Sequence, residues 1–218
     1  MNYLKQNSIG IKNLAQDYSH QVLNNIHNDD INIAIWDRNF AIDGTLIEQI
    51  DSGLEFDIRA SGTIQSISNK TETFFRARMP DQNKLFADVI SVLSLFQTVT
   101  KCKSYNLLFT TVSTNMCRKF HTDMNDLRLL CTYYGAGTLW LPDTNINRKA
   151  VATGADNGAL VIDEEKVMQV KTGNVCVLKG AAYPTKNAYA CVHRSPTIEE
   201  LNQRRILLRI DTNDLSNY

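Results

Sequence analysis

The spacing of the hydrophobic positions changes near residue 103. Upstream of it, residues 81–97 repeat apolar side chains at helical spacing, which predicts an amphipathic helix with Asp81 as its N-terminal cap. One face of this helix carries Leu85, Val89, Val92 and Phe96. A shorter helix is predicted over residues 43–53 and a strand over residues 31–37.

Downstream of residue 103 the pattern becomes that of short strands. Several β-rich runs are separated by Gly, Asn, Asp or Pro clusters, with no long helical pattern between them. They span residues 105–113, 127–134, 158–162, 166–170, 174–178, 188–193 and 205–211. Short strands of this kind are typical of a sandwich or an open barrel of the jelly-roll type. We therefore predict a mainly β protein with an α-helical N-terminal layer.

The same patterns bear on domain organisation. We expect residues 1–103 to pack as a mixed α/β layer on a β core formed by residues 104–218. The chain contains no internal repeat, low-complexity tract or clear linker, so independent domains are not predicted. A length of 218 residues suits one substantial hydrophobic core. We expect one structural domain overall.

Composition and charge narrow the classes of function. With 43% hydrophobic and 21% charged residues, the chain has the composition of an ordinary globular protein. Basic and acidic residues number 23 each, so no net charge favours nucleic acid or an anionic membrane. Residues 1–20 lack the apolar run of a secretion signal, and no uncharged run is long enough to span a bilayer. We expect a cytoplasmic protein without a nucleic-acid or membrane partner; the sequence identifies no substrate.

Candidate chemistry begins with His121 and Asp123. In a strand, residues two apart project from the same face, so this pair is able to bind one ion. A further imidazole is available at His193, where a later predicted strand ends. Two imidazoles and one carboxylate are the ligand set that holds Fe(II) on one face and leaves the opposite positions open. We predict a metal site of His121, Asp123 and His193.

Two arginines open the last predicted strand. Arginine binds a carboxylate through two parallel hydrogen bonds, so one of them is a candidate for holding a cosubstrate carboxylate. Arg205 shares a strand face with Leu207 and Arg209, whereas Arg204 shares the fully apolar face. If the apolar face lined the barrel interior, Arg204 would be the one that points inward. Both remain candidates, and we prefer Arg205.

His-x-Asp, a distal His and an Arg on the following strand resemble the pattern of the 2-oxoglutarate and Fe(II)-dependent oxygenases, whose fold is a cupin-like double-stranded β-helix. The segments "FHTD", "RLLCTYYGAGTLWLP", "LKG" and "HRSP" are together similar to an uncharacterised bacterial family of unknown function. The resemblance implies that the triad binds Fe(II) and that Arg205 or Arg204 pairs with 2-oxoglutarate. It makes Tyr133 and Lys179 candidates for further cosubstrate contacts. It also implies hydroxylation or demethylation of a substrate.

Cys191 suggests an alternative. It lies two residues before His193, and a fourth ligand from its thiolate would complete a tetrahedral site suited to Zn(II). Such a closed site would belong to a non-catalytic zinc-binding or cupin-like protein. The simpler interpretation of Cys191 is a small buried side chain, because its neighbours Ala190 and Val192 are apolar.

Overall fold

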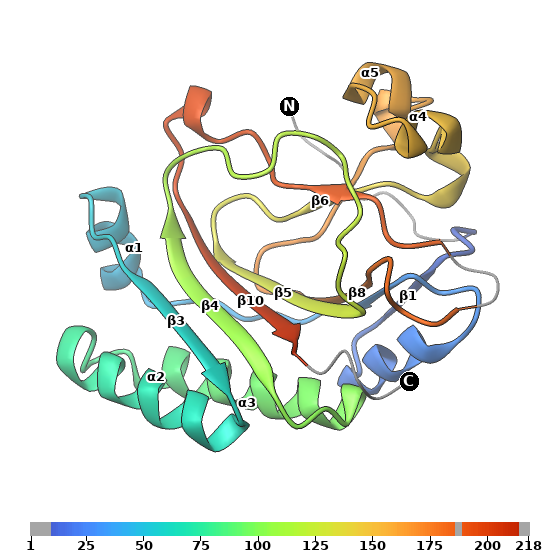
Figure 1. The fold of residues 1–218 in the computed structure, drawn as a ribbon. Coiled ribbons are helices and arrows are strands. Elements are labelled where there is room, and N and C mark those ends of the chain that lie inside the picture. Colours follow the sequence, from blue (N-terminus) through green and yellow to red (C-terminus); the bar gives the residue numbers. More distant parts are fainter. Residues whose placement is uncertain (1–9, 186–188, 214–218) are drawn as a thin grey trace.

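A large twisted sheet forms the centre of the computed structural model, which describes residues 10–185 and 189–213 (Figure 1). The strand order is β1-β2-β8-β5-β10-β4-β3. Neighbouring strands are antiparallel except β1 and β2, which run parallel. The bounds are β1 Leu14–Asp17, β2 Ile33–Trp36, β3 Asp57–Gly62, β4 Tyr105–Val112, β5 Leu127–Tyr134, β8 Val175–Lys179 and β10 Arg205–Thr212.

A smaller sheet faces the central strands of the large one. Its order is β7-β6-β9, with bounds Met168–Gln169, Leu139–Trp140 and His193–Arg194, and a bridge adds His121 beside β9. From β4 onward the chain passes back and forth between the two sheets, except that the consecutive strands β6 and β7 both lie in the smaller one. Four antiparallel elements in each sheet, connected in this way, make a double-stranded β-helix of the jelly-roll, cupin-like kind. The predicted fold class is confirmed.

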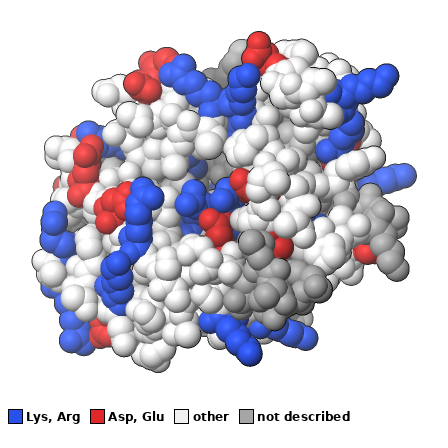
Figure 2. Space-filling model, in the orientation of Figure 1, with Lys and Arg blue, Asp and Glu red and all other residues white. Residues whose placement is uncertain are grey.

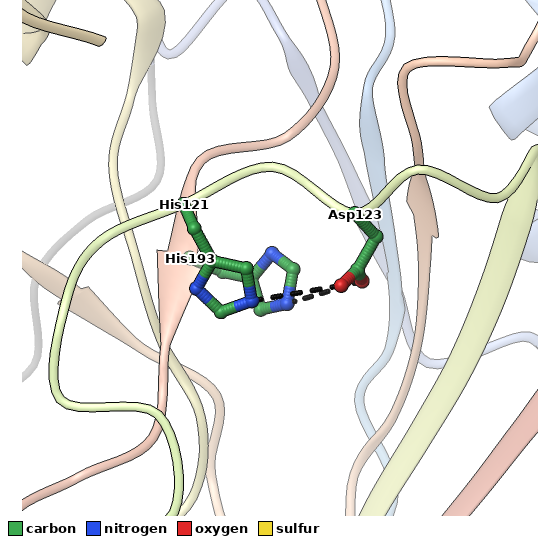
Figure 3. Close-up of side chains that lie close together, drawn as sticks. All are labelled: His121, Asp123 and His193. Carbon is green, nitrogen blue, oxygen red and sulfur yellow. Dashed lines mark ion pairs between the residues drawn. The ribbon is translucent and has the colours of Figure 1, made fainter. Parts of the chain in front are cut away.

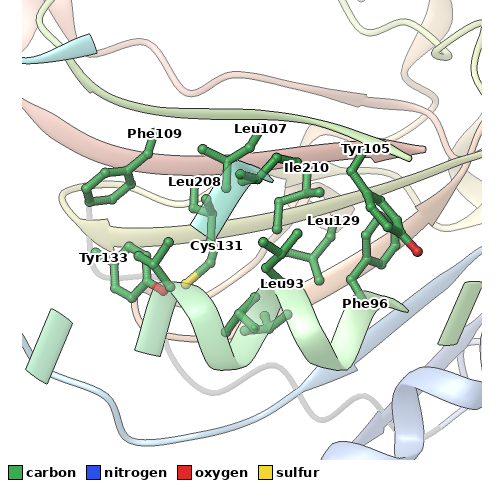
Figure 4. Close-up of a cluster of buried hydrophobic side chains, with 14 of the residues drawn as sticks. Leu93, Phe96, Tyr105, Leu107, Phe109, Leu129, Cys131, Tyr133, Leu208 and Ile210 are labelled. Carbon is green, nitrogen blue, oxygen red and sulfur yellow. The ribbon is translucent and has the colours of Figure 1, made fainter. Parts of the chain in front are cut away.

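Helices cover the outer face of the large sheet. Packing on this face is apolar: Leu93 and Phe96 of α3 meet alternate residues of β4, β5 and β10 (Figure 4). Alternation then decides what faces the barrel interior. Ile206, Leu208 and Ile210 belong to the core under the helices, so Arg205, Leu207 and Arg209 project toward the smaller sheet. The helical elements are η1 His20–His27, α1 Gly44–Asp51, α2 Ile64–Arg78, α3 Asn83–Thr100, η2 Asp143–Asn145, α4 Arg148–Ala152, α5 Asn157–Leu160, η3 Glu164–Lys166 and η4 Glu199–Leu201.

The predicted elements compare well with the observed ones in the core and less well elsewhere. The helix expected over 81–97 is α3, although its N-cap is Gln82 without a side-chain bond, not Asp81. The helix expected over 43–53 is α1, capped by Asp43. The strand expected over 158–162 is wrong, because α5 occupies most of that run. Of the strand expected over 188–193, residue 188 lies outside the described residues and only His193 is in a strand.

Residues before position 103 contribute strands to the large sheet in addition to the helical layer. Strands β1, β2 and β3 are hydrogen-bonded into the same sheet as β4, β5, β8 and β10. The expected division at residue 103 therefore does not coincide with a break in the sheet. Within residues 10–185 and 189–213, no helix combines the length and apolar character needed to cross a bilayer.

A largely buried ion pair joins the helical layer to the sheet. Arg38 donates to both oxygens of Asp88 at 2.6 and 2.8 Å, and the Tyr133 hydroxyl donates to Asp88 at 2.7 Å. Asp88→Ala is expected to lower the free energy of unfolding by about 3–5 kcal/mol, because it leaves the Arg38 charge buried without its partner. Chemical denaturation measures this change.

The matched control is an exposed pair on α2. Glu72→Ala removes the partner of Arg76, whose side chain is 80% exposed, and is expected to cost only about 0.3–0.5 kcal/mol. Equal losses in the two variants would contradict a structural role for the buried pair.

Candidate metal centre

Two histidines and one aspartate converge between the sheets. His121 and His193 are held side by side by reciprocal backbone hydrogen bonds of 3.0 Å, and their ring centroids are 4.7 Å apart. Asp123 reaches the same point from the loop before β5, and both rings are directed toward it (Figure 3). One ligand atom from each residue lies within 4.8 Å of the others. The structure thus brings the predicted triad together.

The orientation of each imidazole is set by a backbone carbonyl. Nδ1 of His121 lies 2.9 Å from the Lys119 oxygen, and Nδ1 of His193 lies 3.2 Å from the Cys191 oxygen. A carbonyl only accepts hydrogen bonds, so each Nδ1 carries a proton, and in the neutral imidazole each Nε2 presents a lone pair. The Nε2 atoms lie 3.5 and 3.3 Å from the Asp123 carboxylate. A hydrogen bond from Nδ1 to a backbone carbonyl is the second-sphere arrangement expected around metal-binding histidines.

Asp123 keeps one oxygen for a ligand. Its Oδ1 lies 2.6 Å from Nη1 of Arg128, whereas its buried Oδ2 accepts no hydrogen bond from any described residue. Burial alone would raise the pKa of Asp123, but contact with the imidazoles in their protonated form and with Arg128 holds it well below its usual value. The same contact with Asp123 raises the pKa of His121. An ionised carboxylate with an unpaired, buried oxygen beside two nitrogen lone pairs fits a divalent cation.

Asp123 is held by a loop and not by a strand, in contrast to the prediction. His121 forms an isolated bridge, and the chain then leaves the sheet until β5 begins. The segment after β8 holds this loop in place: the Gly180 amide donates to the backbone carbonyl of Asp126 and the Ala181 amide to the backbone carbonyl of Asp123, both at 2.7 Å. A Cβ atom on Gly180 would come within 2.1 Å of the Asn125 carbonyl oxygen. Glycine is therefore required here for the two segments to approach.

We expect Gly180→Ala to weaken metal binding by about tenfold or more. The added methyl displaces the loop that carries Asp123, and small displacements of this size have large effects on a site. Competition with a chelating dye measures the dissociation constant. Gly158→Ala is the control, because its Cβ would meet nothing within 4 Å. Unchanged affinity in the Gly180 variant would show that the segment after β8 does not position Asp123.

The two candidate arginines lie in different environments. Arg204 is on the surface, where its Nη1 is 3.4 Å from Glu55. Arg205 is 1% exposed, and its one hydrogen bond among the described residues is to Thr132 Oγ1 at 3.1 Å. Burial lowers the pKa of Arg205 to about 10, and no carboxylate among the described residues offsets this effect. A buried guanidinium without an acidic partner is costly unless an anion binds to it.

The sequence matches one family model over residues 17–211, described as "Protein of unknown function (DUF1826)". The chain belongs to this family. The assignment drawn from the motifs to a family of unknown function is confirmed. Among curated proteins, none matches this chain.

Oxygenases and a cupin protein are among the solved structures that this member of the family resembles. The dioxygenase for auxin oxidation 1 from Arabidopsis thaliana, in complex with 2-oxoglutarate, is 10% identical with a TM-score of 0.43; the match covers 72% of this chain and 62% of that one. A prolyl-4-hydroxylase from Pseudomonas putida is 7% identical with a TM-score of 0.43, covering 88% and 96%. Oxalate decarboxylase from Bacillus subtilis is 15% identical with a TM-score of 0.29, covering 52% and 22%.

Tyr133 and Lys179 lie on the other side of the sheet from the triad. The Tyr133 hydroxyl donates to Asp88 under the helices, and the Lys179 ammonium donates to the Asn28 carbonyl at 2.8 Å. Both side chains follow the strand face that packs against the helical layer, because they alternate with inward-facing neighbours. Their expected contacts with a cosubstrate are not supported by this placement.

Cys191 does not join the ligand set. Its side chain is fully buried in the apolar cluster between the sheets, and burial raises the pKa of its thiol well above the usual value. The possible ligand group found among the described residues contains His121, Asp123 and His193 alone. The structure therefore agrees with the simpler interpretation of Cys191 as a small core residue.

Sequence reasoning did not select the residues that support the triad. Arg128 links Asp123 to Asp211, to which it donates through Nε and Nη2 at 2.6 and 3.1 Å. The alternation of "RILLRID" does place Arg209 and Asp211 on the face of Arg205. Gly180 lies in the "LKG" motif. Both features can be read from the sequence, but their connection to the triad becomes clear only when the pairing of the strands is known.

Proposed function

We propose that this protein is a non-haem Fe(II), 2-oxoglutarate-dependent oxygenase that hydroxylates or demethylates its substrate. The observation that carries the proposal is the convergence of two imidazole Nε2 atoms and one carboxylate within 4.8 Å, with each Nδ1 held by a backbone carbonyl. Three such ligands on one side of a cation leave the remaining positions for cosubstrate and oxygen. Zn(II) also accepts these ligands, but a closed four-ligand zinc site would need a further donor.

Each part of the site has a role in this proposal. When bound together, Fe(II) and 2-oxoglutarate supply the oxidative decarboxylation of 2-oxoglutarate by O2 to succinate and CO2, coupled to insertion of one oxygen atom into a C–H bond. His121, Asp123 and His193 hold the cation. Arg205 binds the far carboxylate of 2-oxoglutarate, with Thr132 orienting the guanidinium.

The interior between the sheets suits the exclusion of water. Its cluster includes Leu130, Leu207 and Trp140, all nearly inaccessible to solvent. The Trp140 indole N–H is buried and donates to no acceptor in the described part of the chain. A bound cosubstrate would offer it one. Apolar walls of this kind strengthen the electrostatic contacts inside the site.

Anaerobic titration tests the proposal. Metal-free protein is loaded with Fe(II), and 2-oxoglutarate binding is then measured by calorimetry, followed by a succinate assay on exposure to oxygen. We expect 2-oxoglutarate to bind only when metal is present and succinate to form slowly even without the substrate. Binding of equal strength with and without metal, or none at all, would reject the oxygenase. Metal analysis of the protein purified without oxygen distinguishes iron from zinc.

A further inference from the structure

Arg209 is a second arginine on the interior face of β10. It follows Arg205 and Leu207 on this face and precedes Asp211. Its partner across the ladder on β5 is Leu130, two residues beyond Arg128. The Arg209 side chain is 32% exposed, so it is open to solvent on one side. Figure 2 shows a hollow near the centre of the side of the molecule that it draws, with basic and acidic side chains around it.

The contacts of Arg209 leave most of its hydrogen-bonding capacity unused. Its Nε lies 3.2 Å from Asp211 Oδ2. Asp211 already accepts two hydrogen bonds from Arg128 and one from Asn125 at 2.9 Å, so it is shared between two guanidinium groups. Neither terminal amine of Arg209 donates to an acceptor within the described ranges. Asp211 therefore meets Arg209 as an ion pair at Nε, without a well-aligned hydrogen bond, and the Nη1/Nη2 edge is left available.

With metal and 2-oxoglutarate bound, Arg209 has no acid of its own among the described residues, because it shares Asp211 with Arg128. A divalent cation, the Asp123 carboxylate and dianionic 2-oxoglutarate together leave one negative charge, which Arg205 neutralises. Arg128 and Asp211 cancel one another. Arg209 then remains as the excess positive charge of this group, at the edge of a largely apolar interior, where an anionic ligand would balance it.

We propose that Arg209 binds an anionic group of the primary substrate, of the carboxylate, sulfonate or phosphate class. The proposal rests on the function proposed above, because the charge count includes the metal and the cosubstrate. The planar guanidinium edge matches two oxygens of such a group. The primary substrate is thus a molecule with an oxyanion placed beside the C–H bond that reacts.

A neighbouring arginine shows the contrasting case. Arg59 on β3 lies in the same row across the sheet, opposite Leu108, which is itself opposite Arg209. Arg59 forms two hydrogen bonds of 3.0 Å with both oxygens of its own partner, Asp57. Its side chain is 73% exposed. Arg59 therefore has a dedicated acid and does not need a ligand.

The test uses small anions as probes. Protein loaded with Mn(II), which avoids turnover, and saturated with 2-oxoglutarate is titrated calorimetrically with acetate, methanesulfonate and inorganic phosphate at constant ionic strength. We expect at least one of them to bind, and acetamide, the neutral analogue of acetate, not to bind. Arg209→Gln is expected to weaken anion binding about tenfold or more while 2-oxoglutarate affinity is unchanged. Arg59→Gln should change neither.

A second variant controls for the possibility that Arg209→Gln does not fold. Arg209→Lys keeps the charge and is expected to retain part of the anion binding but not the two-point contact. If the loaded wild-type protein binds none of the anions, or if Arg209→Gln weakens 2-oxoglutarate as strongly as it weakens the anions, the inference is overturned and the oxygenase proposal stands. If metal and 2-oxoglutarate do not bind at all, both are rejected.

Discussion

His193→Ala is expected to abolish metal binding while leaving the fold intact. Loss of a residue that only orients a ligand already costs about 10–100-fold in metal affinity, so loss of a ligand should cost more than about 100-fold. The strand pairing survives because the bonds between residues 193 and 121 use backbone atoms. In the wild-type protein, metal at 100 times its Kd should stabilise the fold by about 2.7 kcal/mol. The variant should show no metal-induced rise in Tm.

Two further variants complete this experiment. His20→Ala removes an exposed imidazole whose ring meets Trp36, and it should keep the full response to metal. Asp123→Asn keeps the shape of the ligand but not its charge, so it should lose most of the response even if the alanine variant is poorly folded. A normal metal response in both triad variants would show that the three residues form a purely structural cluster.

Arg205→Met is expected to weaken 2-oxoglutarate binding by about 2–5 kcal/mol, which is about 30-fold or more in Kd. The guanidinium has no acidic partner in the described part of the chain, so its contribution is realised only when a carboxylate binds. For the same reason the ligand-free variant should be at least as stable as the wild type, since methionine fills the interior without a desolvation cost. Calorimetry and denaturant unfolding measure the two effects.

Arg204→Met is the matched control for this change. Arg204 is adjacent in the chain but lies at the surface beside Glu55. Its variant should bind 2-oxoglutarate like the wild type. If the Arg204 variant lost affinity and the Arg205 variant did not, the assignment based on strand alternation would be reversed.

The parts of the fold that could be predicted are those with a strong local pattern. Strand β5 was predicted with its observed bounds, and the apolar face of α3 is buried as expected. Helix α2 was missed because only Ile67, Thr71 and Phe75 of its length are buried, too narrow a stripe to show. The run at 158–162 was misread because Val161 and Ile162 look strand-like, yet Ile162 is 65% exposed. An apolar run is not a buried strand unless a partner covers it.

The candidate site, too, was predictable in part. Spacing and order were enough to bring His121, Asp123 and His193 together as predicted. Which face of a strand points inward was not predictable, because β5 is apolar on both faces, with Leu129 under the helices and Leu130 between the sheets. The fully apolar face of β10 packs against the helices, so Arg205 and not Arg204 points to the interior. Which of the two arginines points inward becomes clear only from the order of the strands in the sheet.

The position of β10 has a consequence for biosynthesis. It inserts between β4 and β5, so both of these strands expose an unpaired, apolar edge until residues 205–212 have left the ribosome. Pairings that span so much of the chain close slowly, and nascent intermediates with open edges are prone to aggregate. Truncated or stalled translation products should therefore depend on chaperones, and refolding yields should fall steeply with protein concentration.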